Sequence, residues 1–95
     1  MQKAFACSLC HNGILGGTLY LEENAIIYKT NKITVDKAYR NIVLPYDAIA
    51  QITWKYIILP IATFHMKNGK KYNIIIFNKS RFEKCYQEIV NDNID

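Results

Sequence analysis

From residue 4 to residue 77 the chain is dominated by β-branched and aromatic residues, which turn residues interrupt at short intervals. This pattern is typical of a meandering antiparallel sheet. The strand-favouring residues fall into these runs: 4–10, 15–22, 25–30, 42–44, 50–56, 61–67 and 71–77. We therefore predict about seven strands, with a long connection between the third and the fourth.

The sharpest local signal is the sequence Lys67-Asn68-Gly69-Lys70. Asn-Gly favours the positive φ angles of a type I′ turn, whose twist matches that of the flanking strands. It therefore predicts a hairpin between the last two strands. Gly16 and Gly17 interrupt the second run and predict a bulge or a tight bend there. Pro45 ends the fourth run, and a single turn is expected after it.

After Phe77 the spacing of apolar residues changes to the period of a helix. Five side chains share one helical stripe: Phe82, Cys85, Tyr86, Ile89 and Val90. Ser80 and Glu83 have the spacing of a capping box, in which each side chain accepts a hydrogen bond from the backbone of the other residue. We predict an amphipathic helix over residues 81–92 whose stripe packs against the sheet.

The composition limits the class of protein. A length of 95 residues allows one small domain, predicted to span 1–95. Because 51% of the residues are hydrophobic and 21% are charged, the chain is not expected to be disordered. The formal charge of +4 is a mild excess, and it favours a solvated basic surface over a dedicated nucleic-acid binder. The longest apolar run, 56–62, is too short to cross a bilayer.

The cysteines are Cys7, Cys10 and Cys85, an odd number that favours the reducing cytoplasm. Cys7, Cys10 and His11 have the order of a metal half-site. Residues three apart in a strand point to opposite faces, however, so the two thiols are not expected to converge on one ion or to form a disulfide. We expect buried thiols and predict no metal and no cofactor.

The sequence contains no pattern typical of an active site. His11 and His65 lie in different predicted elements, and neither belongs to a motif that builds a catalytic triad. The glycines near the N-terminus precede a strand and not a helix, so they do not predict a phosphate-binding loop. We therefore predict that the protein is not an enzyme and has no catalytic residues.

An apolar segment, 56–61, lies between two predicted strands, where a polar connection is expected. Pro60 excludes an uninterrupted central strand here. The segment either folds inward beneath the end of the sheet, or protrudes and contacts a membrane or another protein chain. Burial in the core is the alternative that we favour. If the segment is exposed, Ile57, Ile58 and Leu59 are the expected membrane or partner contacts.

Four segments together form a recognisable pattern of residue classes. A Gly-x-Leu-x-Leu strand at 17–21 is followed by a strand ending in an aromatic residue at 24–30. A strand and Pro-containing turn then lie within 42–52, and a final hairpin lies at 67–77. With the helix that follows, this pattern resembles the GRAM branch of the pleckstrin-homology (PH) superfold. The resemblance covers almost the whole chain, and a short chain rich in Ile, Asn and Lys looks like a small bacterial stand-alone member.

The resemblance implies a mainly β fold, a partly open barrel of two packed sheets with one end plugged by the C-terminal helix. It also implies a binding module for lipid headgroups, peptides or proteins, without chemistry of its own. In lipid-binding members, the loops after strands one, three and six border the headgroup site. Carried over to this sequence, these loops hold His11 and Asn12 and then six cations: Lys32, Lys37, Arg40, Lys67, Lys70 and Lys71.

Specific phosphoinositide binding in that family uses cations in and after the first loop, but residues 11–20 contain neither Lys nor Arg. Weak electrostatic attachment, worth about 1 kcal/mol per cation near an anionic leaflet, fits better. Our first hypothesis is a cytoplasmic binding module, peripheral to an anionic membrane or specific for a small ligand, that uses the basic loop rim, with residues 57–59 as an optional further contact. The alternative is a protein-interaction or self-assembling module that uses a strand edge or the apolar 57–60 loop. Binding of single-stranded nucleic acid is the least favoured hypothesis, and its base-stacking candidates are Tyr28, Tyr39, Tyr46 and Tyr72.

Overall fold

The computed structural model describes residues 3–10, 13–31 and 39–92. Within these residues the strands are β1 (Lys3–Cys10), β2 (Ile14–Leu21), β3 (Ala25–Lys29), β4 (Asn41–Pro45), β5 (Ile49–Tyr56), β6 (Pro60–Met66) and β7 (Lys71–Ile76). A 3-10 turn, η2 (Tyr46–Ala48), joins β4 to β5, and the helix α1 (Lys79–Asp92) follows β7. Each predicted run therefore corresponds to one strand whose ends agree within about one residue. The predicted C-terminal helix is also confirmed.

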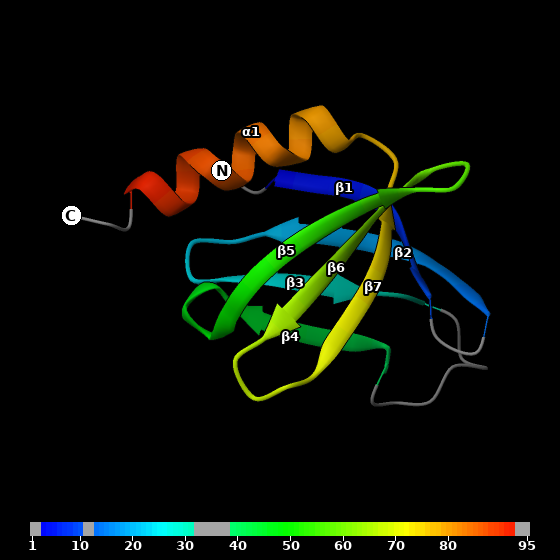
Figure 1. Ribbon diagram of the computed structural model, residues 1–95, viewed down its shortest axis with the longest axis horizontal. Helices are drawn as coiled ribbons and strands as arrows, with labels where there is room; N and C mark the ends of the chain where they lie inside the picture. Colours follow the sequence, from blue (N-terminus) through cyan, green and yellow to red (C-terminus); the bar gives the residue numbers. More distant parts are fainter. Residues whose placement is uncertain (1–2, 11–12, 32–38, 93–95) are drawn as a thin grey trace.

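The strands form one antiparallel sheet in the order β4-β3-β2-β1-β7-β6-β5. This sheet curls, so that β5, β6 and β7 lie across β2, β3 and β4 (Figure 1). β1 belongs to both halves, because it pairs with β2 along its whole length and with β7 from Cys7 to Leu9. The result is a curled half-barrel, which confirms the predicted mainly β fold.

The core lies between the two halves of the curled sheet. Side chains alternate between the two faces of a strand, and in β1 the inward-facing residues Phe5, Cys7 and Leu9 are buried. In β4, Ile42 and Leu44 are buried in the same way, while Val43 between them is exposed. The largest fully buried side chains from the other strands are Leu19, Leu21, Ile26, Tyr28, Phe64, Ile74 and Ile76.

The helix covers one end of the half-barrel through Phe82, which is 1% exposed. Its ring contacts three rings of the sheet, with centroid distances of 5.6 Å to Phe5, 5.9 Å to Trp54 and 6.2 Å to Phe64. These partners come from β1, β5 and β6, so one side chain holds α1 against both halves of the sheet. The predicted apolar stripe of the helix is therefore confirmed.

The helix begins at Lys79, two residues earlier than predicted, and Asn78 precedes it. The Asn78 Oδ1 atom accepts a hydrogen bond of 3.3 Å from the backbone N–H of Arg81, and the Asn78 carbonyl accepts one of 3.0 Å from Phe82. Asparagine is as favourable at an N-cap as serine. The predicted capping box is therefore wrong, because Ser80 lies inside the first turn.

The predicted bulge at Gly16 and Gly17 is also wrong, since β1 and β2 pair without a register shift. Gly17 is required for a different reason. A Cβ atom at this position would collide with the backbone carbonyl of Lys29 and would lie 2.8 Å from Cε1 of Tyr28. The Tyr28 ring is fully buried, and its hydroxyl donates a hydrogen bond of 2.7 Å to the carbonyl of Leu15. Glycine therefore makes room for this ring.

Candidate functional site

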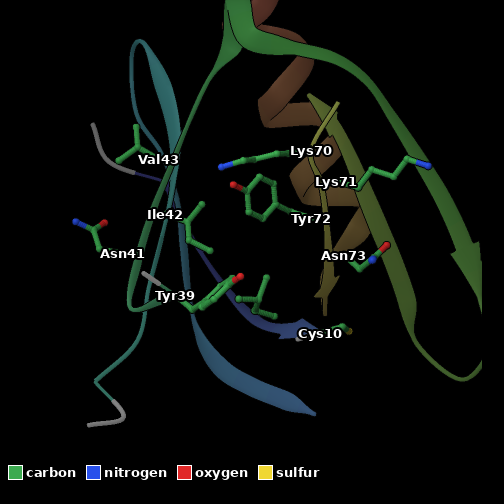
Figure 2. A pocket seen from close by; sticks show the side chains of 10 residues that line it. Cys10, Tyr39, Asn41, Ile42, Val43, Lys70, Lys71, Tyr72 and Asn73 are labelled. Atoms are coloured by element: carbon green, nitrogen blue, oxygen red, sulfur yellow. The ribbon is translucent and has the colours of Figure 1, made fainter. Parts of the chain in front are cut away.

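A cleft opens between β4 and β7, at the end of β1 that is distant from the helix. Its volume is about 510 Å³, within the usual range of roughly 300–1,000 Å³ for small-molecule sites. Its lining comes from the end of β1, the start of β4 and the start of β7: Leu9, Cys10, Tyr39, Asn41, Ile42, Val43, Lys70, Lys71, Tyr72 and Asn73 (Figure 2).

Strand alternation determines which β7 side chains face the cleft. Tyr72 precedes the buried Ile74 by two residues and pairs with the buried Phe64, so it lies on the inner face, while Lys70 directly precedes the strand. In Figure 2, Lys70 and Tyr72 extend across the cleft toward Ile42, whereas Lys71 points to the opposite side. The cleft therefore receives one ammonium group and one phenol ring from the start of β7.

The opposite wall is mainly apolar. Tyr39, which precedes β4, lines the cleft and packs against the core. Ile42 of β4 and Leu9 of β1 are buried residues that also line the cleft. Two phenol rings, Tyr39 and Tyr72, thus border an apolar floor, with the Lys70 ammonium group above it. This arrangement suits a ligand that combines an anionic group with a flat or apolar body.

The backbone of Lys70 is held by the predicted hairpin between β6 and β7, which the structure confirms. The predicted type I′ turn is wrong, however, because the Gly69 N–H donates a hydrogen bond of 3.0 Å to the Met66 carbonyl, so the loop is three residues long with Gly69 at its bulge. The Lys70 carbonyl accepts a hydrogen bond of 2.8 Å from the Met66 N–H, and the Lys70 N–H donates one of 2.9 Å to Oδ1 of Asn68. Gly69 has a φ of 93°, in the left-handed region that favours glycine. The hairpin thus fixes the base of the Lys70 side chain at the edge of the cleft.

The predicted basic rim comprises six cations: Lys32, Lys37, Arg40, Lys67, Lys70 and Lys71. Lys70 and Lys71 line the cleft. Lys67 and Arg40 lie in the adjoining segments but do not line it. Lys32 and Lys37 fall outside the described residues. Within the described part of the rim, Lys70 is therefore the cation that points into the cleft.

Tyr39 and Tyr72 entered the sequence analysis only as possible base-stacking residues, and their place in one cleft was not predicted. Tyr72 could have been found from the alternation in β7, because it stands two residues before the buried Ile74. Tyr39 gave no such signal, since it ends a long connection without periodicity. Its place beside β7 follows from the curl of the whole sheet.

The favoured prediction that Ile57, Ile58 and Leu59 are buried is wrong. These residues form the connection between β5 and β6, here called the β5–β6 tip, and their side chains are 76%, 90% and 39% exposed. Pairing of β5 with β6 ends at Tyr56 and Pro60, so the three residues between them project beyond the sheet (Figure 1).

The cleft and the β5–β6 tip lie at opposite ends of β6. This strand starts at Pro60 beside the tip and ends at Met66, where the hairpin that holds Lys70 begins. A rise of about 3.3 Å per residue separates the two ends by roughly 20 Å. One flat surface therefore cannot contact both features, although our first hypothesis combined them.

The prediction of buried thiols is correct for Cys7 alone, because Cys10 and Cys85 are half-buried and Cys10 lines the cleft. Cys7 is buried, and this burial raises the pKa of its thiol to about 12. Cys85 packs against the core from α1. On β6, Nε2 of His65 lies 2.8 Å from Oγ1 of Thr53 on the neighbouring strand. Among the residues that the structure describes, which exclude His11, no three His, Cys, Asp or Glu side chains are grouped as metal ligands would be.

Comparison with protein-family models found no match for this chain, and comparison with curated proteins found none either. Over the described ranges, the chain has no helix with the length and apolar character that a bilayer span requires. The cleft and the β5–β6 tip are therefore the features from which a function is inferred.

Proposed function

We propose that this chain is a non-catalytic binding module of the GRAM/PH type, and that its cleft takes a small ligand with an anionic group and a flat or apolar body. The observation that carries the proposal is the position of Lys70 and Tyr72, which extend from the start of β7 across a cleft with an apolar floor (Figure 2). Ligand sites commonly combine apolar walls with a few well-placed polar groups.

The chemistry of the lining favours such a ligand. Apolar ligand surface that the cleft removes from water contributes about 25 cal/mol per Å². The rings of Tyr39 and Tyr72 add flat surface for stacking. Lys70 is exposed at the mouth, where an ammonium group can bind an anion while it remains partly hydrated, at little cost in desolvation.

The placement of Cys7 and of His65 also favours binding over catalysis by these two residues. A nucleophilic cysteine needs an accessible thiolate and an adjacent base. Cys7 is buried, and its raised pKa of about 12 keeps the thiol protonated at neutral pH. His65 lies on the outer face of β6, next to the buried Phe64, and its ring contacts Thr53.

A fluorescence titration with 8-anilinonaphthalene-1-sulfonate tests the proposal, because this probe combines an aromatic body with a sulfonate. We expect saturable binding, which Lys70→Gln weakens about tenfold through loss of a charge-assisted contact. Lys67→Gln is the matched control, since it removes the same charge from the same hairpin outside the cleft. Equal affinities of the two variants would contradict the proposal.

The anionic group could belong to a soluble molecule or to a lipid headgroup. Displacement of the bound probe is measured with glycerol phosphate and with phosphatidylglycerol vesicles. The comparison distinguishes a soluble ligand from a lipid headgroup. Displacement by glycerol phosphate alone identifies a soluble ligand, whereas displacement by the vesicles alone identifies a headgroup held in its bilayer.

A second candidate function is protein interaction or self-assembly through a sheet edge. β4 and β5 end the strand order, and within the described residues neither is covered by a further strand. Such edges accept an added strand from another chain. Light scattering over a range of concentrations tests self-assembly, and a constant monomeric mass would contradict it.

A further inference from the structure

The residue types of the β5–β6 tip are not explained by the fold. Tight connections between strands usually contain Gly, Asn, Asp, Ser or Pro, because these residues suit turn backbones and water. Here three consecutive large aliphatic residues, Ile57, Ile58 and Leu59, form the connection, and Ile58 is the most exposed of them. They contribute little to the core, so their apolar character points to an external contact.

Two aromatic residues extend this apolar surface. Tyr56 precedes the tip and is exposed. Phe77 is half exposed and follows β7. The β6–β7 register pairs Ile61 with Ile75, so Phe77, just beyond the end of β7, lies at the same end of the sheet as the tip. The tip and both aromatic residues therefore lie at one end of the molecule.

A cationic side chain lies next to this apolar end of the molecule. The Nζ atom of Lys79 lies 5.0 Å from the ring centroid of Trp54 and 5.2 Å from that of Tyr56, and 3.7 Å from the Glu83 carboxylate. Arg81, on the same first turn, is engaged elsewhere, because its guanidinium lies 4.4 Å from the ring centroid of Phe5 and donates a hydrogen bond of 3.1 Å to the Ala4 carbonyl on β1. Aromatic rings with Lys next to an apolar end resemble the composition of proteins at the depth of lipid headgroups.

The distribution of charge along the chain favours an anionic partner. Residues 48–82 contain no Asp or Glu, but they include these six cations: Lys55, Lys67, Lys70, Lys71, Lys79 and Arg81. The formal excess of +4 over the whole chain therefore arises in this segment. Lys55 directly precedes Tyr56, so it lies near the tip, on the opposite face of β5 from the two rings that Lys79 contacts. Lys55 and Lys79 thus stand on either side of the tip, and their charge complements the surface of an anionic membrane.

We propose that the β5–β6 tip inserts into the interfacial region of an anionic lipid bilayer, with Lys55 and Lys79 against the headgroups. A stable protein interface buries roughly 800 Å² on each partner. A projecting connection of three residues is too narrow for that, and it would need a matching groove. A bilayer needs no preformed groove, because its acyl chains adapt to the inserted side chains.

The β5–β6 tip is separate from the cleft. Their positions at opposite ends of β6 define how the protein is oriented on the membrane. With the tip in the bilayer, β6 leads away from the membrane, and the mouth beside Lys70 lies roughly 20 Å further out. The cleft then faces the aqueous side, and its ligand comes from solution. A headgroup of the same membrane cannot reach it.

Vesicle co-sedimentation tests the proposal, with phosphatidylcholine alone and with an equal mixture of phosphatidylcholine and phosphatidylglycerol. We expect binding to the anionic vesicles at low salt. The double variant Ile57→Ser, Ile58→Ser should lower the partition coefficient about tenfold or more through loss of two aliphatic side chains. Ile14→Ser is the matched control, because Ile14 is an exposed isoleucine near the cleft. Lys55→Gln should weaken binding about fivefold.

Insertion depth gives an independent readout. Tryptophan fluorescence of Ile58→Trp should be quenched by lipids with brominated acyl chains. Ile14→Trp should show only the quenching of the native Trp54. Equal quenching of the two variants would overturn the proposal, as would the absence of binding to anionic vesicles at low salt.

Other outcomes separate this proposal from the function of the cleft. If Lys70→Gln abolished vesicle binding and the tip variant bound like the wild type, the cleft would hold a headgroup and the tip proposal would fail. If the wild type did not bind vesicles but formed dimers, and the tip variant did not form dimers, the tip would be a contact between two copies of this chain. That result would also overturn the proposal.

Discussion

The hydroxyl group of Tyr46 donates a hydrogen bond of 2.7 Å to the carbonyl oxygen of Glu22. Tyr46 begins η2, between the edge strands β4 and β5, whereas Glu22 directly follows β2. The backbone N–H of Tyr46 also donates a bond of 3.2 Å to the Asn24 carbonyl. These two bonds tie the connection between the edge strands to the turn between β2 and β3.

Tyr46→Phe removes the first of these bonds and leaves the Glu22 carbonyl without that donor. We expect a loss of about 1 kcal/mol in the free energy of unfolding. Urea denaturation followed by circular dichroism measures it. Tyr56→Phe is the control, because its hydroxyl belongs to an exposed side chain. Equal midpoints for both variants would show that the bond contributes nothing.

Phe82→Ala removes the ring that joins α1 to three strands. Large-to-small substitutions of buried Phe cost about 3–5 kcal/mol, so we expect this variant to lose most of its stability. Ile58→Ser, at an exposed position, should change the free energy of unfolding by less than about 0.5 kcal/mol. Guanidinium denaturation compares the two. Similar losses would mean that the β5–β6 tip packs against the fold in solution.

Gly17→Ala places a methyl group against the Lys29 carbonyl and the buried Tyr28 ring. Neither neighbour can move without disturbing the pairing of β2 with β3, so we expect a loss of about 3 kcal/mol. Gly69→Ala meets no neighbouring atom but keeps a positive φ, and should cost about 1 kcal/mol. Thermal unfolding compares the stabilities of the two variants. A larger loss for Gly69→Ala than for Gly17→Ala would contradict the conclusion that Gly17 makes room for the Tyr28 ring.

Stability should fall as the pH rises above about 9. Burial raises the pKa of Cys7 from 9.0 to about 12 in the folded chain. Between these values the unfolded chain loses the thiol proton and the folded chain keeps it, so deprotonation favours unfolding. Burial raises the pKa of Tyr46 as well, which extends the trend to higher pH.

Urea denaturation of the wild type and of Cys7→Ala, at about pH 8 and about pH 10, checks this expectation. The variant is less stable at both values, because it leaves a cavity. Its stability should nevertheless fall less between them than that of the wild type. An equal fall in both proteins would assign the pH dependence to other groups.

The strands and their inward faces could be predicted because alternation and Asn-Gly are local signals. The Lys70 hairpin, the stripe that contains Phe82 and the overall fold class followed from them. The helix cap could not be decided in this way. Asn78 and Ser80 are both good capping residues two positions apart, and the choice depends on where α1 must start for Phe82 to reach the core.

The site depended on long-range placement. The apolar character of Ile57 and Ile58 was evident, but their exposure depends on whether another element covers that end of the sheet. The position of Tyr72 follows from the periodicity of β7, whereas the opposite wall at Tyr39 follows from the curl that brings β4 across from β7. Local patterns carry no information about such a curl.

The place of β1 has a consequence for how the chain acquires its structure. Cys7 pairs with both Gly17 and Ile76. The first pairing is complete once a short N-terminal piece has left the ribosome, but the second requires a strand that is synthesised near the end. Folding rates fall as native pairings become more distant along the chain. We therefore expect closure at the β1–β7 seam to be the slow step of folding, and a nascent chain that stops before β7 to leave the inner face of β1 open to aggregation.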